Sequence, residues 1–139
     1  MPLSYHPEIG TIVICDFDGI EPEMTKKRPA IIVSPRLRNR EGLCTVVPLS
    51  ITEPDIIMPY HYKLTFREPL PPPFDSPFKW VKGDMLATVS LERLNLPYGG
   101  KDEKGRRKYI TRIVDDIDLR KVRECILHGL ALSDLTRHL

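Results

Sequence analysis

The sequence predicts a mainly β fold, a small β-barrel with α additions, in which one helix lies at the C-terminal end. Three observations predict it. Short segments in the first two thirds of the chain cluster or alternate apolar residues, as strands do. The 14 prolines are about twice the usual share, which argues against a mostly helical chain. Near the end, the apolar residues change to helical spacing. We therefore expect five or more short, curled strands and one terminal helix.

Length and composition indicate one folded domain over residues 1–139. Hydrophobic residues make up 41% of the chain and charged residues 29%, so a packed core is expected and wholesale disorder is excluded. The net charge of +2 excludes a histone-like polycation. It does not exclude nucleic-acid binding, because the clustering of charge matters more than its sum.

The sequence gives no sign of a membrane span or a secretion signal. No apolar run approaches the roughly 18 residues of a span, and residues 1–5 have neither a basic segment nor a long apolar stretch. The three cysteines form no close pair, which is typical of a reducing compartment. We expect a cytoplasmic protein that has no membrane partner.

The first two strands are expected at 11–17 and 30–33. Segment 11–17 alternates apolar with small or polar residues and follows Gly10, a good turn residue. Segment 30–33 is a continuous, branched apolar run that Pro29 and Pro35 limit in length. Such a run predicts a short strand that is buried on both faces.

Three more strands are expected at 43–49, 60–66 and 85–89. The polar turn 39–42 should join the strand 43–49 to the strand before it as a hairpin. Segment 60–66 alternates and places one set of side chains on a single face. That set is Tyr60, Tyr62, Leu64 and Phe66.

Two segments interrupt this pattern and read as insertions, at 67–79 and 97–109. The first contains five prolines around Phe74, which predicts a stiff, extended loop outside any central strand. The second is glycine-rich and highly charged, which predicts an exposed hairpin or a mobile loop.

The terminal helix is predicted by an apolar stripe at helical spacing, formed by Leu119, Val122, Ile126 and Leu130. Asp118 is the expected N-cap, because its carboxylate can accept from free backbone N–H groups. Ile117 and Val122 would then form a hydrophobic staple around it. Gly129 weakens this helix without forbidding it.

Several kinds of chemistry find no support in the sequence. Cys15, Cys44 and Cys125 have apolar neighbours, which predicts buried, inert thiols. No cysteine–histidine spacing resembles a zinc site, and no glycine-rich loop precedes a helix. His61 and His138 are expected to be solvated surface residues. We therefore expect neither a metal nor a cofactor.

Three local groups are candidates for a site that binds phosphate. In the polar loop 23–29, the planar guanidinium of Arg28 can hold a phosphate through two hydrogen bonds; the alternative is an ordinary basic loop. Ser50 follows a buried strand and can donate to a phosphate oxygen, or simply cap the strand end. Lys82 and Asp84 stand two apart, so they face the same side of an extended segment. One can stabilise charge while the other moves a proton, or they form a solvated ion pair of little value.

In order along the chain, these segments resemble the PemK/MazF family of toxin endoribonucleases from bacterial toxin–antitoxin pairs. The resemblance covers roughly residues 5–66 and 79–96, and the Arg-Pro-Ala-apolar-Ser-Pro block after an Asp-Phe strand is its most specific part. The matching pieces are residues 5–10, 12–18, 22–24, 28–35, 46–50, 82–84 and 91–94.

The resemblance implies a small Src-homology-like barrel with a C-terminal helix. It also implies a homodimer that cuts single-stranded RNA, such as mRNA, without metal, and a cognate antitoxin with which the toxin binds DNA. By resemblance, Arg28 takes the place of the essential arginine and Ser50 that of a residue contacting the scissile phosphate. Lys82 and Asp84 fall where relatives carry acid–base residues. Glu23 matches an acidic loop residue near the RNA.

The RNA path is expected to use basic side chains, with Trp80 as a stacking platform or, as the alternative, a core residue. These cations are Lys26, Lys27, Arg36, Arg38 and Arg40. The chain departs from relatives at Pro22 and Met24, which stand for histidine and glutamine, and at Ala87, which stands for a second arginine.

The expected function is therefore a toxin with metal-independent, single-strand-specific endoribonuclease activity, in which the ribose 2′-hydroxyl attacks the adjacent phosphate. Two alternatives stay open. One is a gyrase-binding toxin of the CcdB type, although residues 136–139 lack the tryptophan expected there. The other is a barrel that binds RNA or a partner peptide without cleaving.

Overall fold

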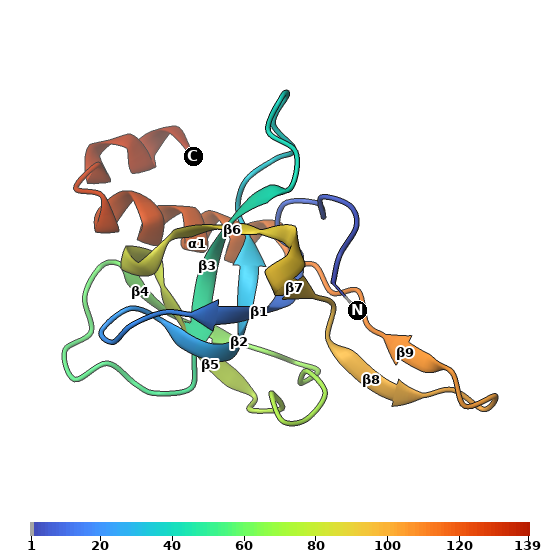
Figure 1. Ribbon diagram of the computed structural model, residues 1–139. Helices are drawn as coiled ribbons and strands as arrows, with labels where there is room; N and C mark the ends of the chain where they lie inside the picture. The colour runs from blue at the N-terminus through green and yellow to red at the C-terminus, as the bar shows by residue number, and fades with distance from the viewer. Residues whose placement is uncertain (1) are drawn as a thin grey trace.

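The strands form one antiparallel sheet that wraps around a central strand, β3 (Figure 1). The computed structural model describes residues 2–139. The strands of the main sheet are β1 (Ile12–Asp18), β2 (Thr25–Ile32), β3 (Leu43–Ser50), β4 (His61–Thr65), β5 (Phe78–Lys82), β6 (Ala87–Ser90) and β7 (Leu94–Asn95). Their order is β4-β5-β3-β2-β1-β7, and β6 also pairs with β3. The mainly β class is confirmed. Within residues 2–139, no pairing of β4 with β7 closes the sheet into a barrel.

The remaining elements lie outside this sheet. A separate hairpin of β8 (Tyr98–Lys101) and β9 (Arg107–Tyr109) projects from the body (Figure 1). The helix α1 (Asp116–Gly129) follows, and the 3₁₀ helix η3 (Ser133–His138) ends the chain. Among residues 2–139, no helix has the length and apolar character needed to cross a membrane.

Strand β2 is longer than the apolar run 30–33 suggests. It starts at Thr25 and passes through Pro29, which lies opposite Ile14 of β1. Strand β3 pairs with β2 only from Ala30 onward, so the first half of β2 has a single paired edge. A proline is tolerated there, because its missing N–H costs no ladder hydrogen bond when that position faces the open edge. The hairpin expected between this strand and β3 is confirmed.

One continuous stretch runs antiparallel to β3 but is broken in the middle. Strand β5 pairs with the end of β3, where Ser50 lies opposite Trp80, and β6 pairs with its beginning. The 3₁₀ turn η1 (Gly83–Met85) separates the two strands. The strand expected at 85–89 therefore begins later, at Ala87, and residues 83–85 leave the sheet.

The sheet carries a core cluster on each face. One cluster includes Ile12, Ile31 and Leu49 together with Val122 of α1. The other includes Val13, Ala30 and several neighbours on the opposite face. Alternate residues of β1 and β2 thus enter different clusters, which confirms that this part of β2 is buried on both faces.

Helix α1 starts three residues earlier than expected. Its N-cap is Asp115, whose side chain accepts from the backbone N–H of Asp118 at 2.8 Å. The expected cap at Asp118 and the staple by Ile117 are wrong: Ile117 is 73% exposed. The carboxylate of Asp118 instead accepts from the hydroxyl of Tyr62 at 2.9 Å. Burial and this hydrogen bond raise the pKa of Tyr62 to about 12.

Two glycines let α1 pack directly on η1. A Cβ at Gly83 would lie 2.5 Å from the backbone carbon and oxygen of Cys125, and a Cβ at Gly129 would lie 2.9 Å from the Cα of Asp84. Contacts this short do not occur with real side chains. Gly129, which weakens the isolated helix, is thus required by the packing.

The loop 66–77 is more folded than a stiff extended segment. Leu70 is buried in the core, and the backbone turns where Phe74 N–H donates to the carbonyl of Pro71 at 3.1 Å. The ammonium of buried Lys79 donates to the carbonyl of Phe74 at 2.8 Å. This hydrogen bond holds the loop against β5. Burial lowers the pKa of Lys79, and nearby Asp75 partly offsets it.

We expect Gly83→Ala to lower the free energy of unfolding by about 3 kcal/mol, because a methyl group there meets the backbone of α1, which cannot move aside as a side chain would. Urea unfolding followed by circular dichroism measures the change. Gly42→Ala is the matched control: its methyl group meets nothing within 4 Å, so only the strain of a φ of +77° remains, about 1 kcal/mol. Equal losses in the two variants would contradict this account.

Candidate active site

Three of the expected catalytic residues border one cavity of about 340 Å³: Arg28, Ser50 and Glu23. They come from three places in the fold, namely β2, the last position of β3 and the β1–β2 connection. Met85 of η1 completes the wall. The pairing of β2 with β3 and the interruption at η1 therefore create this cavity together.

The guanidinium of Arg28 is held in place by the first residue of its own strand. Arg28 is the fourth residue of β2, opposite Cys15 of β1, and it is half-buried. Its Nε donates to the carbonyl oxygen of Thr25 at 2.8 Å. The ion pairs found among residues 2–139 do not include Arg28. Its terminal nitrogens are thus free of a carboxylate and suited to a doubly hydrogen-bonded oxyanion.

Ser50 combines both interpretations made from the sequence. It is 7% exposed, and its Oγ accepts from the backbone N–H of Thr52 at 3.2 Å, as a residue that caps a strand end does. The same side chain borders the Arg28 cavity. A hydroxyl that accepts one hydrogen bond still has its proton to donate, for example to a phosphate oxygen.

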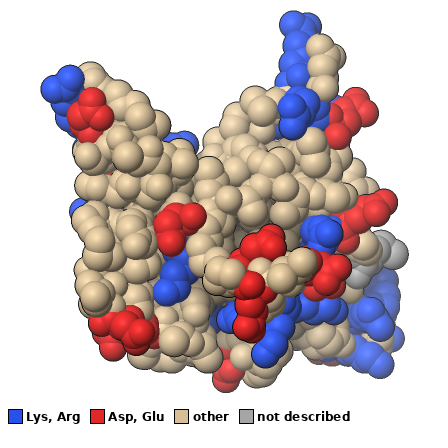
Figure 2. Space-filling view, turned by 60° about the vertical axis from the view of Figure 1, so that its left-hand side comes forward, with Lys and Arg blue, Asp and Glu red and all other residues tan. Residues whose placement is uncertain are grey.

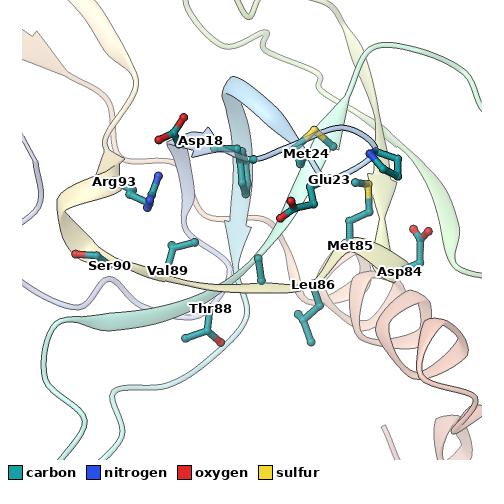
Figure 3. Close-up of a pocket in the computed structure, with 14 residues that line it drawn as sticks. Asp18, Glu23, Met24, Asp84, Met85, Leu86, Thr88, Val89, Ser90 and Arg93 are labelled. Atoms are coloured by element: carbon teal, nitrogen blue, oxygen red, sulfur yellow. The ribbon is translucent and has the colours of Figure 1, made fainter.

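A second, larger cavity of about 610 Å³ shares Glu23 and Met85 with the first. Figure 3 shows the side chain of Glu23 directed into it, while Asp84 lies at its margin, beyond Met85. One carboxylate oxygen of Glu23 accepts from the backbone N–H of Ile20 at 3.1 Å, which fixes the connection. Glu23 is thus the carboxylate common to both cavities.

Sequence reasoning missed Arg93, which lines the larger cavity opposite Asp84 (Figure 3). Its Nη1 donates to the carbonyl oxygen of Asp16 at 3.1 Å. Arg93 lies in the 3₁₀ turn η2 (Leu91–Arg93), inside the segment 91–94 that contributes to the family resemblance. The match of segment 91–94 to the family was therefore the sequence feature that could have pointed to Arg93. Where relatives carry an arginine at the position of Ala87, this chain brings a cation into the cavity from Arg93.

Lys82 and Asp84 do not share a face of a strand. Strand β5 ends at Lys82, and Asp84 lies in η1, so the alternation expected for an extended segment is broken. Lys82 borders neither cavity. Burial lowers its pKa, and the charge of Asp84 partly offsets this effect. Half-buried His61 lies opposite Lys82, and its pKa is lowered by burial and then by the Lys82 charge.

Trp80 belongs to the interior. Its side chain is 5% exposed in the middle of β5, between Ser50 of β3 and Lys63 of β4. A ring so covered has no face to offer to a base. The core alternative therefore holds, and the stacking role expected for Trp80 is wrong.

The expected basic path splits into two groups. Lys26 and Lys27 are exposed beside Arg28, whereas Arg36, Arg38 and Arg40 lie in the connection 33–42, at the opposite end of β2. Figure 1 shows that connection standing away from the β1–β2 connection, and Figure 2 shows basic side chains near its tip. On the face that carries the candidate site, acidic and basic side chains are mixed (Figure 2). One chain therefore does not form a continuous basic path.

The three cysteines take no part in this site. All are buried, as expected. Burial raises the pKa of Cys15 to about 12 and that of Cys125 to about 11, and it raises the pKa of Cys44 as well. Within residues 2–139, no group of three or more His, Cys, Asp or Glu side chains is placed to hold a metal ion.

Comparison with known sequences identifies one family. The sequence profile described as "PemK-like, MazF-like toxin of type II toxin-antitoxin system" matches residues 8–130. The chain is also 28% identical over 122 residues to YifN, an uncharacterized protein of Escherichia coli (strain K12), covering 68% of this chain and 76% of that protein.

Comparison with solved structures supports the fold. A mycobacterial endoribonuclease in complex with its cognate antitoxin is 20% identical, with a TM-score of 0.62, covering 91% of this chain and 97% of that one. MazF from Deinococcus radiodurans is 22% identical, with a TM-score of 0.57, covering 92% and 99% of the two chains. At this level of identity, the likeness establishes the arrangement of strands and helix.

We expect the folded protein to resist alkylation by iodoacetamide at pH 8. The thiolate is the reactive form, and a raised pKa reduces its share, so the folded thiols should modify far more slowly than the same thiols in urea. Mass spectrometry counts the modified cysteines with time. Rapid modification of any of the three in the folded protein, at the rate seen in urea, would contradict their assignment as inert core residues.

Proposed function

The chain belongs to the PemK-like, MazF-like family of type II toxin–antitoxin toxins, and we propose that it is an endoribonuclease that cleaves single-stranded RNA without metal. The observation that carries the proposal is the cavity that Arg28, Ser50 and Glu23 all border. These groups supply a cation, a hydrogen-bond donor and a proton acceptor. The mycobacterial relative in complex with its antitoxin is itself an endoribonuclease, which supports the same activity here.

The proposed reaction needs no nucleophile from the protein. The ribose 2′-oxygen attacks the adjacent phosphorus, so a 2′-O–P bond forms while the bond from phosphorus to the 5′-oxygen breaks. The proton of the 2′-hydroxyl passes to a base, and the 5′-oxygen takes up a proton. The products are a 2′,3′-cyclic phosphate and a free 5′-hydroxyl. The protein has to move two protons and stabilise the negative charge that gathers on the non-bridging phosphate oxygens.

Arg28 is assigned to charge stabilisation. Its Nε donates to the Thr25 carbonyl, which restrains the planar guanidinium at the border of the cavity. Ser50, which borders the same cavity, adds one hydrogen-bond donor. An arginine guanidinium keeps its proton in proteins, so Arg28 is not assigned to proton transfer.

Glu23 is the preferred proton acceptor. It borders the same cavity as Arg28, whereas Asp84 borders only the larger one, and Figure 3 shows Asp84 at the margin beyond Met85. Asp84 is then free to act on the leaving 5′-oxygen or to contact the RNA further along. Arg93 provides the cation of the larger cavity, in place of the second arginine of relatives.

We further propose that the protein acts as a homodimer and is inhibited by a cognate antitoxin in the cytoplasm. A relative of the same fold is known in complex with its antitoxin, and the D. radiodurans protein is known as a MazE–MazF complex. Gyrase binding is not favoured, because the family and its structural relatives point to RNA cleavage.

We expect Arg28→Ala to reduce the rate of RNA cleavage by about 100-fold, the effect of removing one group that stabilises an oxyanion. Arg28→Lys should restore part of the rate, since it keeps the charge but not the paired donors. Cleavage of a labelled, mixed-sequence single-stranded RNA is followed by gel electrophoresis. Arg123→Ala, on the exposed side of α1, is the matched control. An Arg28→Ala protein that is folded and cleaves at the parental rate would refute the site.

We expect cleavage to persist in an excess of EDTA and to leave a 2′,3′-cyclic phosphate. Mass spectrometry of the fragments identifies their ends. RNA with a 2′-O-methyl group on every ribose should stay intact, since its nucleophile is blocked. Cleavage of that RNA, or loss of activity in EDTA that added Mg²⁺ restores, would disprove the proposed chemistry.

A further inference from the structure

We propose that the β8–β9 hairpin is a second contact surface for single-stranded RNA, separate from the cavities. This inference rests on the proposed function and extends it to substrate capture. The hairpin corresponds to the charged insertion 97–109, and neither the candidate site nor its two cavities include any of its residues. It projects from the body on the side away from the β1–β2 connection (Figure 1).

The hairpin concentrates the positive charge of the protein. Residues 98–109 contain five Lys or Arg and two Asp or Glu. The hairpin therefore carries +3 while the whole chain carries +2, so the remainder of the chain has a net charge of −1. Every residue from 101 to 109 is exposed. The hairpin is therefore one of the basic surfaces at which a phosphate backbone approaching this protein meets attraction.

The carboxylate of Asp102 makes its contacts within the turn at the tip of the hairpin. Its Oδ1 accepts from the backbone N–H groups of Lys104 and Arg106, both at 2.9 Å. Its Oδ2 lies 3.5 Å from the Nε of Arg106. Asp102 thus shapes the tip and neutralises Arg106, which leaves Lys101, Arg107 and Lys108 along the two strands.

A bulge places two of these cations on the same face as two tyrosines. Arg107 and Tyr109 are two residues apart in β9, so they share a face. Across the hairpin, Lys101 lies opposite Arg107 and Tyr98 lies opposite Tyr109. Directly opposed residues of two paired strands point to the same face, so all four side chains share one face. Lys101 and Tyr98 are three residues apart, and the irregularity between them, where Gly100 has a φ of +91°, absorbs the extra residue.

The resulting surface combines cations with exposed aromatic rings. The rings of Tyr98 and Tyr109 lie 5.9 Å apart, tilted by 54°, and are 46% and 36% exposed. Lys101 and Arg107 lie beside them toward the tip. Proteins bind single strands in this way, with cations along the backbone and aromatic faces under the bases. An acidic peptide would use the cations but not the rings, so the tyrosines favour RNA as the ligand.

The test measures binding without cleavage. Fluorescence anisotropy follows a labelled, mixed-sequence single-stranded RNA in 2′-O-methyl form, which lacks the proposed nucleophile, over a range of NaCl concentrations. For the double variant K101Q/R107Q we expect weaker binding and a log–log salt slope shallower by about 1.4, or about 0.7 for each phosphate that the variant no longer neutralises. The control R106Q/K108Q removes the same amount of charge, but from positions outside the proposed surface. Arg106 is paired with Asp102, and Lys108 points to the opposite face of the hairpin. This control should keep the parental salt slope.

The tyrosines are tested separately from the charge. Y98L/Y109L should weaken binding at least fivefold, because neither position can then stack on a base, while Y98F/Y109F keeps the rings and the parental affinity. Circular dichroism confirms that each variant is folded. Equal weakening in K101Q/R107Q and R106Q/K108Q, or unchanged affinity in Y98L/Y109L, would overturn the proposal.

Two further measurements distinguish a failure of this proposal from a failure of the proposed function. Cleavage of unmodified RNA by the unaltered protein tests the activity alone. If the protein binds the probe through the hairpin face but cleaves nothing, the endoribonuclease proposal fails and the binding surface stands. If K101Q/R107Q retains RNA affinity but loses binding to poly-glutamate, the face recognises an acidic protein segment and the RNA proposal is wrong.

Discussion

Residues 83–85 must leave the sheet and yet pack tightly on α1, and the candidate site depends on that constraint. The stretch that runs antiparallel to β3 breaks there, between β5 and β6. The helix can reach this turn only because Gly83 and Gly129 lack a Cβ. Met85 is thereby fixed at the wall of both cavities, and Asp84 at the wall of the larger one. The packing of the terminal helix therefore also determines the shape of the site.

Two charges at the site are held by the start of β2 and by the connection that leads into it from β1. Thr25 orients the guanidinium of Arg28 through its carbonyl, and Ile20 holds the carboxylate of Glu23 through its N–H. A carboxylate beside a guanidinium suits proton transfer next to a phosphate, but it also weakens the attraction of the site for RNA. The concentration of positive charge in the β8–β9 hairpin offsets that weakness at a distance.

Much of the fold could be predicted because it follows from local patterns. The apolar run in β2 and the helical spacing near the end each reflect which faces are buried, whereas the first four residues of β1 are buried on both faces despite the alternation. The helix cap was misplaced because Asp115, Asp116 and Asp118 are all suitable caps by type. In the structure Asp115 caps the helix, and the carboxylate of Asp118 accepts from the hydroxyl of Tyr62. No local pattern contains that contact, since Tyr62 is distant in sequence.

The sequence by itself determined the family, the strand-rich class and the residue types that can handle a phosphate, because these depend on residue identity and order. The tertiary structure decided which of them meet. It placed Ser50 and Glu23 beside Arg28, brought in Arg93, buried Trp80 and moved Arg36 to the far end of β2. The physical reason is that proximity across a sheet depends on strand register and on where strands are interrupted. Those features are settled by the packing of the whole chain and are not encoded in any one segment.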